Sequence, residues 1–318
     1  MAHQAAPDDR DAPFGAVAVV GSANLDIVVG VPRHPRLGET VIGGDHAQVP
    51  GGKGANQAVA AARLGAPTAF VGRVGTDDPG QALTRALTAD GVDVTALGAD
   101  PDAPSGIALI VVAEDGENTI VVSPGANSRL EPRHVEAAGV VLAEATALLV
   151  QLEVPLDTVA AAVAAARGTV VLNPAPAADL PAEVLARTDV LVPNRSELAL
   201  LAGVEQEPTA TEEVVALARR IEGPRAIVVT LGADGSLVVE GETVTPIPAR
   251  SVDAVDATAA GDAFCAALTV RLVAGASLTD AAAYANTAAA LATTRHGAQP
   301  SLPTRDEVVA ALVHLEET

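Results

Sequence analysis

The chain lacks the residues that build aromatic clusters, disulfide networks and metal centres. Its 318 residues include no tryptophan, one tyrosine, three phenylalanines and one cysteine. Because Cys265 is the only cysteine, no disulfide can form within the chain, and we expect a reducing compartment, the cytoplasm. The six histidines are dispersed, without the spacing typical of metal ligands. With 49% hydrophobic and 1% aromatic residues, we expect a sizeable core of small aliphatic side chains.

Basic residues and long apolar runs are also scarce. The chain has 19 basic residues against 40 acidic ones, a formal net charge of −21. This charge repels nucleic acid and anionic membranes, so we expect neither as a partner. Every apolar run is interrupted before the roughly 18 residues that a membrane span needs. The opening stretch, MAHQAAPDDRDAPFG, is acidic rather than apolar, which predicts a disordered tail over residues 1–14 and no signal peptide.

The chain does contain a regular alternation of β-branched runs and alanine-rich segments. This alternation predicts one α/β domain over residues 15–318, in which helices cover both faces of a mostly parallel sheet as three α/β/α layers. The predicted strands are residues 16–21, 68–75, 146–153, 168–174, 189–194 and 225–232. The predicted helices lie in residues 54–66, 79–91, 155–168 and 196–203, each closed by a glycine.

Two segments break this alternation because they contain no long helical run. They are about residues 24–50 and 105–122, and in the second a turn around Asp115 and Gly116 separates two apolar strands. We expect these segments to form a small β-sheet beside the main one, where it could act as a lid over a cleft.

Lysine occurs once, in the stretch VPGGKGANQAV at residues 49–59, whereas every other basic residue is arginine. A phosphate-binding P-loop would need glycine in place of Ala47, and a dinucleotide-binding loop would need glycine in place of Gln57. What remains is a glycine turn before a helix whose first turn carries Lys53 and Asn56, and whose free amides could bind a ligand. An ordinary strand-to-helix turn with a solvated lysine fits this pattern equally well.

A second stretch, SVDAVDATAAGDAFCAALTVRLVAG at residues 251–275, leads a run of small residues into an apolar helix. Asp262 lies at the start of this helix, where its carboxylate could cap the helix or face a cleft. Amides in such a turn can hold a phosphoryl group, and a neighbouring carboxylate can accept the proton of an attacking hydroxyl. The pattern indicates phosphoryl transfer to an alcohol, with helix capping alone as the alternative.

Eight segments resemble, in order and spacing, the signature segments of the ribokinase family of carbohydrate kinases. They are GSANLDIVV, PGGKGANQAVAAARLGA, QLEVPLDTV, LNPAPAADLP, PNRSELALL, TLGADG, DATAAGDAF and TRHGAQPSLP. The resemblance covers roughly residues 15 to 315. The resemblance implies a ribokinase-like fold with a β-sheet lid, and ATP-dependent phosphorylation of D-ribose at its 5-hydroxyl to give D-ribose 5-phosphate and ADP. It also implies Mg²⁺, K⁺ as a monovalent activator, and a homodimer joined through the lid. The alternatives are a kinase of another sugar or nucleoside, or a non-catalytic sugar-binding regulator with the same fold.

The resemblance assigns roles to particular residues of this chain. The general base is Asp262, and the anion hole comprises Ala259, Ala260 and Gly261. The residues implied to bind the sugar are Asn24, Asp26, Gly52, Lys53, Gly54, Ala55, Asn56, Glu153 and Asp262. Those implied to bind ATP are Asn194, Thr230, Leu231, Gly232, Ala233, Asp234, Gly235, Gly261 and Asn286. Glu197 is implied to hold Mg²⁺ through water, and K⁺ is implied to lie among Asp256, Thr258, Ala292, Arg295, Gly297 and Ser301.

The chain departs from the family pattern at three positions. Ala257 and Ala263 replace hydroxyl residues that are common beside the base, and Arg195 stands where an acidic residue is frequent. Neither missing hydroxyl carries the proton transfer, so the predicted activity remains, whereas Arg195 puts the surroundings of the magnesium site in question. For Lys53 we hypothesise that its compact ammonium neutralises phosphate charge during transfer, with chance retention of a single lysine as the alternative.

Overall fold

A computed structural model describes residues 14–313 of the chain. The predicted N-terminal tail, residues 1–14, lies outside the described residues except for its last one. Phe14 is half-buried and packs against the core, with the guanidinium of Arg305 4.7 Å from the centre of its ring.

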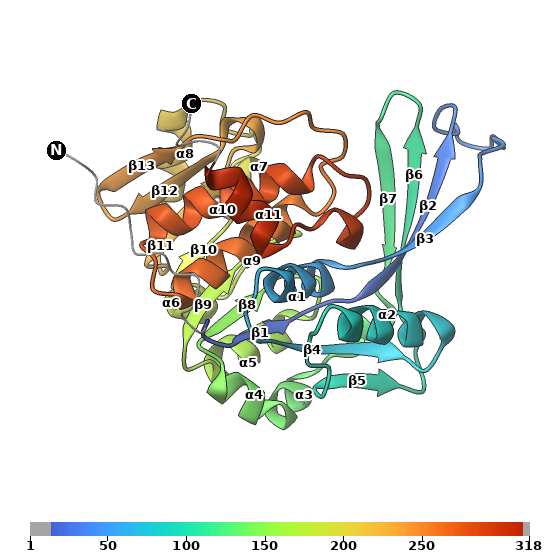
Figure 1. Ribbon diagram of the computed structural model, residues 1–318, viewed down its shortest axis with the longest axis horizontal. Coiled ribbons are helices and arrows are strands. Elements are labelled where there is room, and N and C mark those ends of the chain that lie inside the picture. Colours follow the sequence, from blue (N-terminus) through green and yellow to red (C-terminus); the bar gives the residue numbers. More distant parts are fainter. Residues whose placement is uncertain (1–13, 314–318) are drawn as a thin grey trace.

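Nine strands form one large sheet, and its strand order is β13-β12-β11-β10-β9-β8-β1-β4-β5 (Figure 1). All neighbouring pairs from β11 to β5 are parallel, and only β11–β12 and β12–β13 are antiparallel, which confirms the mostly parallel sheet. The strands are β1 Val17–Val20, β4 Thr68–Gly75, β5 Leu97–Asp100, β8 Ala147–Val150, β9 Thr169–Leu172, β10 Val190–Leu191, β11 Ala226–Thr230, β12 Ser236–Glu240 and β13 Thr243–Ile247.

Each of the six strands predicted from the sequence is present, although β10 is shorter than expected. The sequence prediction missed β5 and β13, which form the two edges of the sheet, and β12, which lies next to β13. Edge strands are covered less completely than central ones, so β5 and β13 lack the continuous apolar run that identified the others. β12 is buried along residues 236–239, but its apolar run is short.

The alternation of side chains along the strands divides the core into two clusters, one on each face. In β1, Val17 and Val19 pack with one cluster, and Ala18 and Val20 pack with the other. The first cluster is covered by α1 Lys53–Arg63, α2 Asp78–Ala89, α9 Ala260–Val273, α10 Leu278–Ala292 and α11 Arg305–Val313. The second is covered by α3 Pro132–Ala137, α4 Gly139–Glu144, α5 Leu156–Ala165, α6 Ala182–Arg187, α7 Arg195–Leu201 and α8 Thr211–Ala218. These are the predicted three α/β/α layers.

The sequence predicted that a glycine closes each of four helices, and this is correct for three of them. After α1, α2 and α7, the glycines at 65, 91 and 203 have positive φ and close the helix as predicted. The predicted glycine closure after α5 is wrong, because α5 ends at Ala165 and Ala166 is already extended. Short 3₁₀ turns complete the fold at η1 Gly125–Arg129, η2 Gly232–Asp234 and η3 Gln299–Ser301. None of the described helices is long and apolar enough to cross a membrane.

A second sheet of four strands, in the order β3-β2-β6-β7, stands at the right of the molecule in Figure 1. Its strands are β2 Asn24–Val31, β3 His46–Gly51, β6 Gly106–Ala113 and β7 Asn118–Ser123. They come from the two segments that the sequence set apart. β6 and β7 pair antiparallel across a turn in which Gly116 has a φ of 89°. Only residues 21–23 separate β1 from β2, so this sheet rises directly from the carboxyl end of a central strand.

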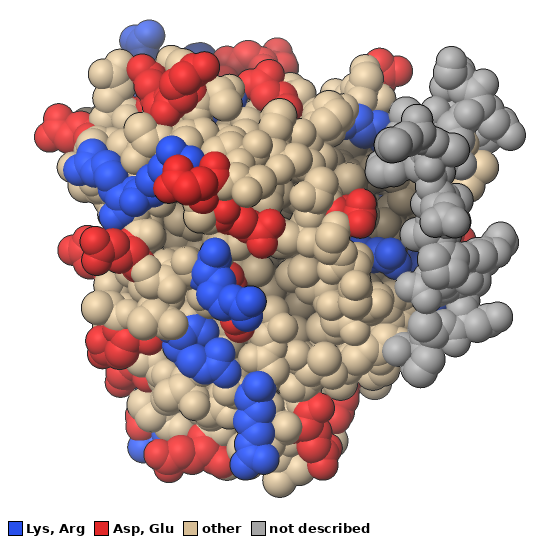
Figure 2. Space-filling model, turned by 90° about the vertical axis from the view of Figure 1, so that its left-hand side faces the viewer, with Lys and Arg blue, Asp and Glu red and all other residues tan. Residues whose placement is uncertain are grey.

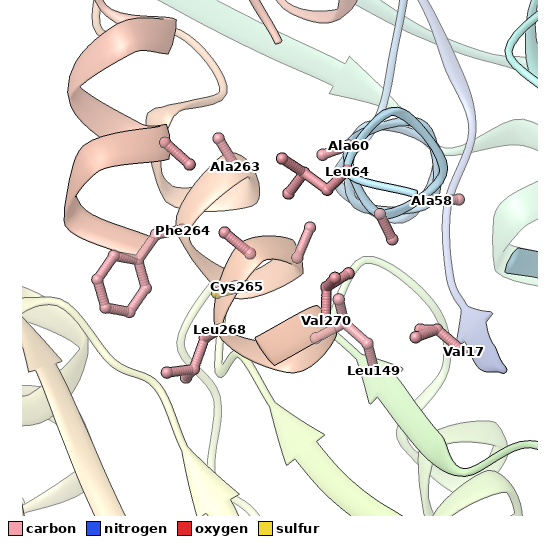
Figure 3. Close-up of a cluster of buried hydrophobic side chains, with 14 of the residues drawn as sticks. Val17, Ala58, Ala60, Leu64, Leu149, Ala263, Phe264, Cys265, Leu268 and Val270 are labelled. Atoms are coloured by element: carbon pink, nitrogen blue, oxygen red, sulfur yellow. The ribbon is translucent and has the colours of Figure 1, made fainter. Parts of the chain in front are cut away.

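Helices α1 and α9 lie against one another through buried aliphatic side chains. Figure 3 shows Ala60 and Leu64 of α1 pointing toward α9, where Ala263 lies opposite them. All three side chains are at most 1% exposed. Ala60 and Ala263 contribute only methyl groups to this contact, beside the larger Leu64.

Charged side chains of both signs are spread over the surface. On the face shown in Figure 2, the described acidic and basic side chains are interspersed, and neither sign covers a continuous region.

Candidate active site

The central strands β1 and β8 are parallel neighbours, so their carboxyl ends meet at one edge of the sheet. From β1 the sheet extends to β4 and β5 on one side, and the chain then returns to β8 on the other side. Ligands of open α/β sheets bind at such a reversal of strand order. The residues that follow these two strands include Ser22, Asn24 and Glu153, so polar side chains gather at the expected edge.

The glycine loop before α1 closes against the start of β2. Gly52 has a φ of 88°, and a Cβ there would lie 2.7 Å from the backbone nitrogen of Asn24, so only glycine fits. This approach brings the Lys53 amide to the carboxylate of Glu153, where it donates to Oε2 at 3.0 Å. Ser22 Oγ donates to the same oxygen at 2.5 Å. Glu153 therefore joins the ends of β1 and β8 to the start of α1.

Asp262 faces the site instead of capping its own helix. It is the third residue of α9 and is 6% exposed, and no side chain caps the helix at Ala259. Asn56 Nδ2 donates to its Oδ2 at 2.9 Å, and Gln57 Nε2 donates to its Oδ1 at 3.1 Å. The sequence left two roles open for this carboxylate, capping its helix or facing a cleft. In the structure it does not cap α9 and points toward α1.

The carboxylates of the site share one lysine. Burial raises the pKa of Asp262, while the ammonium of Lys53 acts in the opposite direction. Burial would lower the pKa of Lys53, but the charges of Asp262, Glu153 and Glu197 outweigh it and the pKa is raised overall. The pKa of Asp26 is raised to about 7, first by burial and then by Glu153 and Asp262. The cluster thus carries excess negative charge, which a protonated lysine partly balances.

The turn before α9 has the features of an anion hole. Ala259 has a φ of 60° and is the only described non-glycine residue with positive φ. The amide of Ala260 donates to Ala257 O at 3.2 Å, within the turn. The amides of Gly261 and Asp262 donate to no acceptor among the described residues. A Cβ at Gly261 would meet no atom within 4 Å, so there is room for a ligand beside these amides.

A pocket of about 230 Å³ brings Lys53 and Asp262 together with the nucleotide-side residues, whereas Asn24, Asp26, Asn56 and Glu153 are not part of its lining. A larger pocket of about 750 Å³ lies beside α2, but none of the sequence-predicted residues lines it, so convergent polar groups rather than volume identify the site. The smaller pocket is lined by Lys53, Asn173, Ala175, Val192, Asn194, Glu197, Thr230, Ala257, Ala259, Gly261, Asp262 and Cys265.

Asn194 and Glu197 form the start of a helix and also line this pocket. Asn194 Oδ1 accepts from the Glu197 amide at 2.8 Å, and Glu197 Oε2 accepts from the Asn194 amide at 2.8 Å, a reciprocal capping box. Burial raises the pKa of Glu197, against the charge of Lys53. Asn194 and Glu197 therefore cap the start of α7, and this role does not exclude a ligand, because both residues also line the pocket.

Of the remaining residues assigned to ATP, Thr230 pairs with Asn194 and begins a loop, and Asn286 lies on α10. Residues 230–235 leave β11 as a tight turn in which the Leu231 amide donates to Gly235 O at 2.8 Å. Arg195 Nη2 pairs with Asp234 Oδ2 at 2.7 Å, so the unexpected arginine is bound to the neighbouring loop and not to the carboxylate of Glu197. The side-chain nitrogen of Asn286 donates to the carbonyls of residues 247 and 248, both at 3.1 Å, and ties α10 to the end of β13.

The residues assigned to K⁺ come together from two segments next to the anion hole. Asp256 accepts from the Thr258 amide at 2.9 Å and from the Gly297 amide at 2.8 Å. Ser301 Oγ donates to Ala298 O at 2.7 Å. Ala292 O accepts from the Arg295 amide at 3.5 Å, and the Arg295 side chain pairs with Glu307. Within residues 14–313 no group of three or more His, Cys, Asp or Glu could hold a metal ion, so a cation here would depend on backbone carbonyls and water.

Four polar residues of the site were missed from the sequence. Asn127 donates to Asn24 Oδ1 at 2.8 Å and accepts from the Ala23 amide, which fixes the start of β2. Gln57 and Asn173 are hydrogen-bonded to one another beneath Asp262, and Ser22 holds Glu153. A polar residue within an apolar or small-residue stretch marks a candidate buried polar position, but it does not show which partner that residue has.

Residues 15–305 match the pfkB family of carbohydrate kinases, and the chain belongs to this family. The match spans both sheets and every part of the pocket, and it confirms the family that the sequence motifs predicted.

Within the family, the chain is similar to ribokinases. It is 40% identical to the ribokinase of Haemophilus influenzae over 301 residues, which cover 94% of this chain and 98% of that protein. It is 39% identical to the ribokinase of Bacillus subtilis, over 92% of this chain and 97% of that one. Its structure resembles the ribokinase of Thermotoga maritima, with a TM-score of 0.86 and 35% identity over 94% of this chain and 100% of that chain. It also resembles the ribokinase of Arabidopsis thaliana complexed with ribose and ATP, with a TM-score of 0.84 and 33% identity over 94% and 99%.

Proposed function

We propose that this protein is a ribokinase that transfers the γ-phosphoryl group of ATP to the 5-hydroxyl of D-ribose. The observation that carries the proposal is the single pocket in which Lys53, Asp262 and the turn before α9 lie opposite Asn194 and Glu197. A base, a cation and an anion hole in one pocket are the parts that phosphoryl transfer to an alcohol requires. The similarity to a ribokinase complexed with ribose and ATP supports the choice of substrates.

On the sugar side, the acceptors needed for a polyol are present. Asn24 and Asp26 are both buried, 3% and 8% exposed, at the start of β2. The Oδ1 atom of Asn56 is buried without a hydrogen-bond partner, so it is available to a sugar hydroxyl. In the reaction, Asp262 accepts the proton of the 5-hydroxyl as its oxygen bonds to the γ-phosphorus and the bond from that phosphorus to the β-phosphate oxygen breaks.

On the phosphoryl side, the amides of Gly261 and Asp262 hold the transferring group. The negative charges of the three carboxylates raise the pKa of Lys53, at the first turn of α1, so its ammonium is protonated before ATP binds. When phosphate oxygens arrive, the same ammonium neutralises their charge as a compact point charge that fits the glycine loop. The loops at residues 194–197 and 230–235 hold the nucleotide.

The proposal includes Mg²⁺ and a monovalent cation. Glu197 lines the pocket, and its carboxylate fits a hydrated Mg²⁺. When bound, this ion would supply positive charge that neutralises the phosphates of ATP. The carbonyl-rich segments at 256–258 and 292–301 fit a weakly hydrated cation such as K⁺. Bound there, it would hold the turn before α9 in shape without contacting the sugar.

The four-stranded sheet completes the proposed enzyme as a lid and as the contact between two copies. Every residue of β7 is exposed, and the apolar side chains of Leu109, Ile120, Val121 and Val122 are 45%, 52%, 60% and 46% exposed. A sheet edge with apolar side chains exposed to this extent favours pairing or packing with another chain. We therefore include a two-fold homodimer joined through this sheet.

The test is ADP release from ATP, measured over a panel of pentoses, hexoses and nucleosides. We expect D-ribose to give the highest kcat/KM and the product to be ribose 5-phosphate by mass and NMR. A higher kcat/KM for another sugar or a nucleoside would replace ribose as the substrate, and release with none of them would support a sugar-binding regulator instead.

A further inference from the structure

Two buried amide side chains form a chain of hydrogen bonds beneath the carboxylate of Asp262. Gln57 Nε2 donates to Asp262 Oδ1 at 3.1 Å and to Asn173 Oδ1 at 3.2 Å. Asn173 Nδ2 in turn donates to the carbonyl of Val192 at 3.0 Å. Gln57 is 0% exposed and Asn173 is 8% exposed. The bonds join α1, the end of β9 and the end of β10 to the start of α9.

The direction of every bond in this chain is fixed at its far end. The carbonyl of Val192 can only accept, so Asn173 must direct its nitrogen there and its oxygen toward Gln57. Gln57 must therefore keep its nitrogen between Asn173 Oδ1 and Asp262 Oδ1. Its own Oε1 is left buried without a partner, which is a cost that the structure tolerates at this position.

Asn56, the other amide on the carboxylate, is not fixed in this way. Its Nδ2 donates to Asp262 Oδ2 at 2.9 Å, while its Oδ1 has no partner. A rotation of this amide would present an acceptor to a protonated Oδ2. Gln57 can present only a donor to Oδ1 without losing the bond to Asn173.

We propose that Gln57, oriented by Asn173, is a positioning residue that keeps Oδ1 of Asp262 a permanent acceptor, so that the proton of the sugar hydroxyl is taken up at Oδ2. The inference rests on the proposed kinase reaction. In that step the hydroxyl O–H bond breaks and its electron pair forms the bond to the γ-phosphorus, while the bond from the γ-phosphorus to the bridging oxygen breaks, ADP leaves with that electron pair, and the proton binds Oδ2. Hydrogen bonds to a carboxylate favour its ionised form, so Gln57 also helps to keep the buried Asp262 ionised and able to accept a proton.

Other charged groups around the carboxylate set the background for this effect. They are Lys53 on α1, Asp26 on β2, Glu153 after β8, Glu197 on α7 and Cys265 on α9. None of them is altered when Gln57 is replaced, so a change in the titration of Asp262 can be assigned to the lost donor.

The main test is Gln57→Met, which keeps the length of the side chain and removes its donors. The lost hydrogen bond favoured the ionised carboxylate, so we expect the acidic limb of the kcat profile to move upward by about one pH unit. We expect kcat at the optimum to fall about tenfold while the KM for the sugar changes less than about twofold, because orientation of the base is lost and sugar contacts are not. An acidic limb at the parent's position would overturn the proposal.

Asn173→Leu tests whether Asn173 acts through Gln57. Alone, it should move the acidic limb in the same direction by a smaller amount. In the double variant Gln57→Met/Asn173→Leu, the shift should equal that of Gln57→Met, because the same bond is already lost. Additive shifts would show that Asn173 acts independently and would overturn its role as the orienting partner.

The matched control is Gln151→Met. Gln151 is also a fully buried glutamine with an unpartnered Oε1, but its Nε2 donates to the carbonyl of Val20 and not to a carboxylate. It should leave the acidic limb at the parent's position. An equal upward shift in this control would mean that loss of any buried glutamine suffices, which contradicts the proposal.

A readout that does not need turnover separates this inference from the proposed function. Carboxyl ¹³C NMR of aspartate-labelled protein, with the Asp262 signal assigned by its absence in Asp262→Asn, follows the titration directly. We expect its midpoint to rise in Gln57→Met. If ribose is not phosphorylated but the midpoint rises, the proposed function fails and Gln57 keeps its role; if ribose is phosphorylated and the midpoint is unchanged, the inference about Gln57 fails alone.

Discussion

At the scale of single residues, the site depends on a few charges held in a small volume. Asp262 and Lys53 come from the first turns of two different helices and meet because both helices begin at the same edge of the sheet. Each begins after a residue with positive φ, Gly52 before α1 and Ala259 before α9. These strained turns let the backbone amides and the first side chains of both helices face one pocket.

Replacement of Asp262 by asparagine should separate binding from chemistry. Asp262→Asn removes the proton acceptor but keeps the size of the side chain, so turnover should fall by roughly 10²-fold or more while calorimetry still detects sugar and ATP binding. Asp280→Asn is a matched control, because Asp280 is also the third residue of its helix, α10, but is exposed and bonds Ser277. Near-normal turnover of the purified Asp262→Asn variant would remove this residue from the mechanism.

Replacement of Lys53 by arginine tests the need for a compact ammonium. Lys53→Arg keeps the charge, but a planar guanidinium has to fit beside Gly52 and Gly54, where a Cβ at Gly54 would already lie 2.7 Å from Gln151. We expect the phosphoryl transfer rate in single turnover to fall about tenfold, because the charge no longer lies at the phosphate oxygens. Parent values for both this rate and the sugar KM would contradict the hypothesis.

The raised pKa of Asp26 makes the stability of the folded chain depend on pH. Between pH 3.8, the ordinary pKa, and about pH 7, Asp26 holds a proton in the folded state that it has lost in the unfolded chain. The stability that this carboxyl group contributes is therefore fully present below about pH 4 and is lost as the pH rises through about 7. Asp26→Asn cannot ionise. We expect the thermal midpoint of the parent to fall from pH 5 to pH 8 by a few degrees more than that of the variant. Equal falls in both proteins would contradict a raised pKa at Asp26.

At the scale of elements, the sequence predicted the central strands and the motif-bearing helices, and it did so for a physical reason. Strands such as 68–75 and 168–174 are covered on both faces, so their residues had to be apolar in an unbroken run. β5, with the sequence LGAD, and β13, which contains Pro246, carry no such run because they lie at the edges. The predictions for Lys53 and Asp262 likewise followed from glycine and small-residue turns, which are local signals.

The part of the site that the sequence could not predict depends on contacts between distant segments. Gln57 and Asn173 are 116 positions apart, and Asn127 meets Asn24 across 103. Nothing local to Gln57 distinguishes a core glutamine from one that holds a carboxylate. Only the register of β1, β8 and β9, which brings their carboxyl ends together, makes these residues neighbours.

The loops at 256–258 and 292–301 act as one element and predict a response to potassium. At constant ionic strength, activity should rise several-fold when K⁺ replaces a large organic cation, because an ion among the loop carbonyls would fix the turn that presents Gly261 and Asp262. Asp256→Asn should reduce the response, since Asp256 joins the two segments. Asp189→Asn is the matched control, as Asp189 also accepts a backbone amide but lies at the start of β10. A flat response of the parent to K⁺ would contradict the assignment of these loops.

At the scale of the whole molecule, the four-stranded sheet predicts association. Light scattering at micromolar concentration should give the mass of a dimer for the parent and of a monomer for Val121→Glu, because a charge on β7 would be buried at the contact. Val140→Glu is the matched control: Val140 is 70% exposed but lies on α4, away from this sheet, and its charge should leave the dimer intact. A monomeric parent would end the dimer proposal, and a dimeric Val121→Glu would move the contact to another surface.

The contact between α1 and α9 acts as a spacer that sets how far Asp262 lies from its two amide donors. Asn56 and Gln57 belong to one helix and Asp262 to the other, so the 2.9 and 3.1 Å bonds between them are also a measure of the gap between the helices. The side chain of Ala60, on the side of α1 that faces α9, lies in this gap, and a larger group there would widen it and stretch both bonds at once (Figure 3). A methyl group one turn away from the amide donors thus determines the geometry of the base, and a survey of tolerated substitutions would find Ala60 as restricted as the charged residues of the pocket.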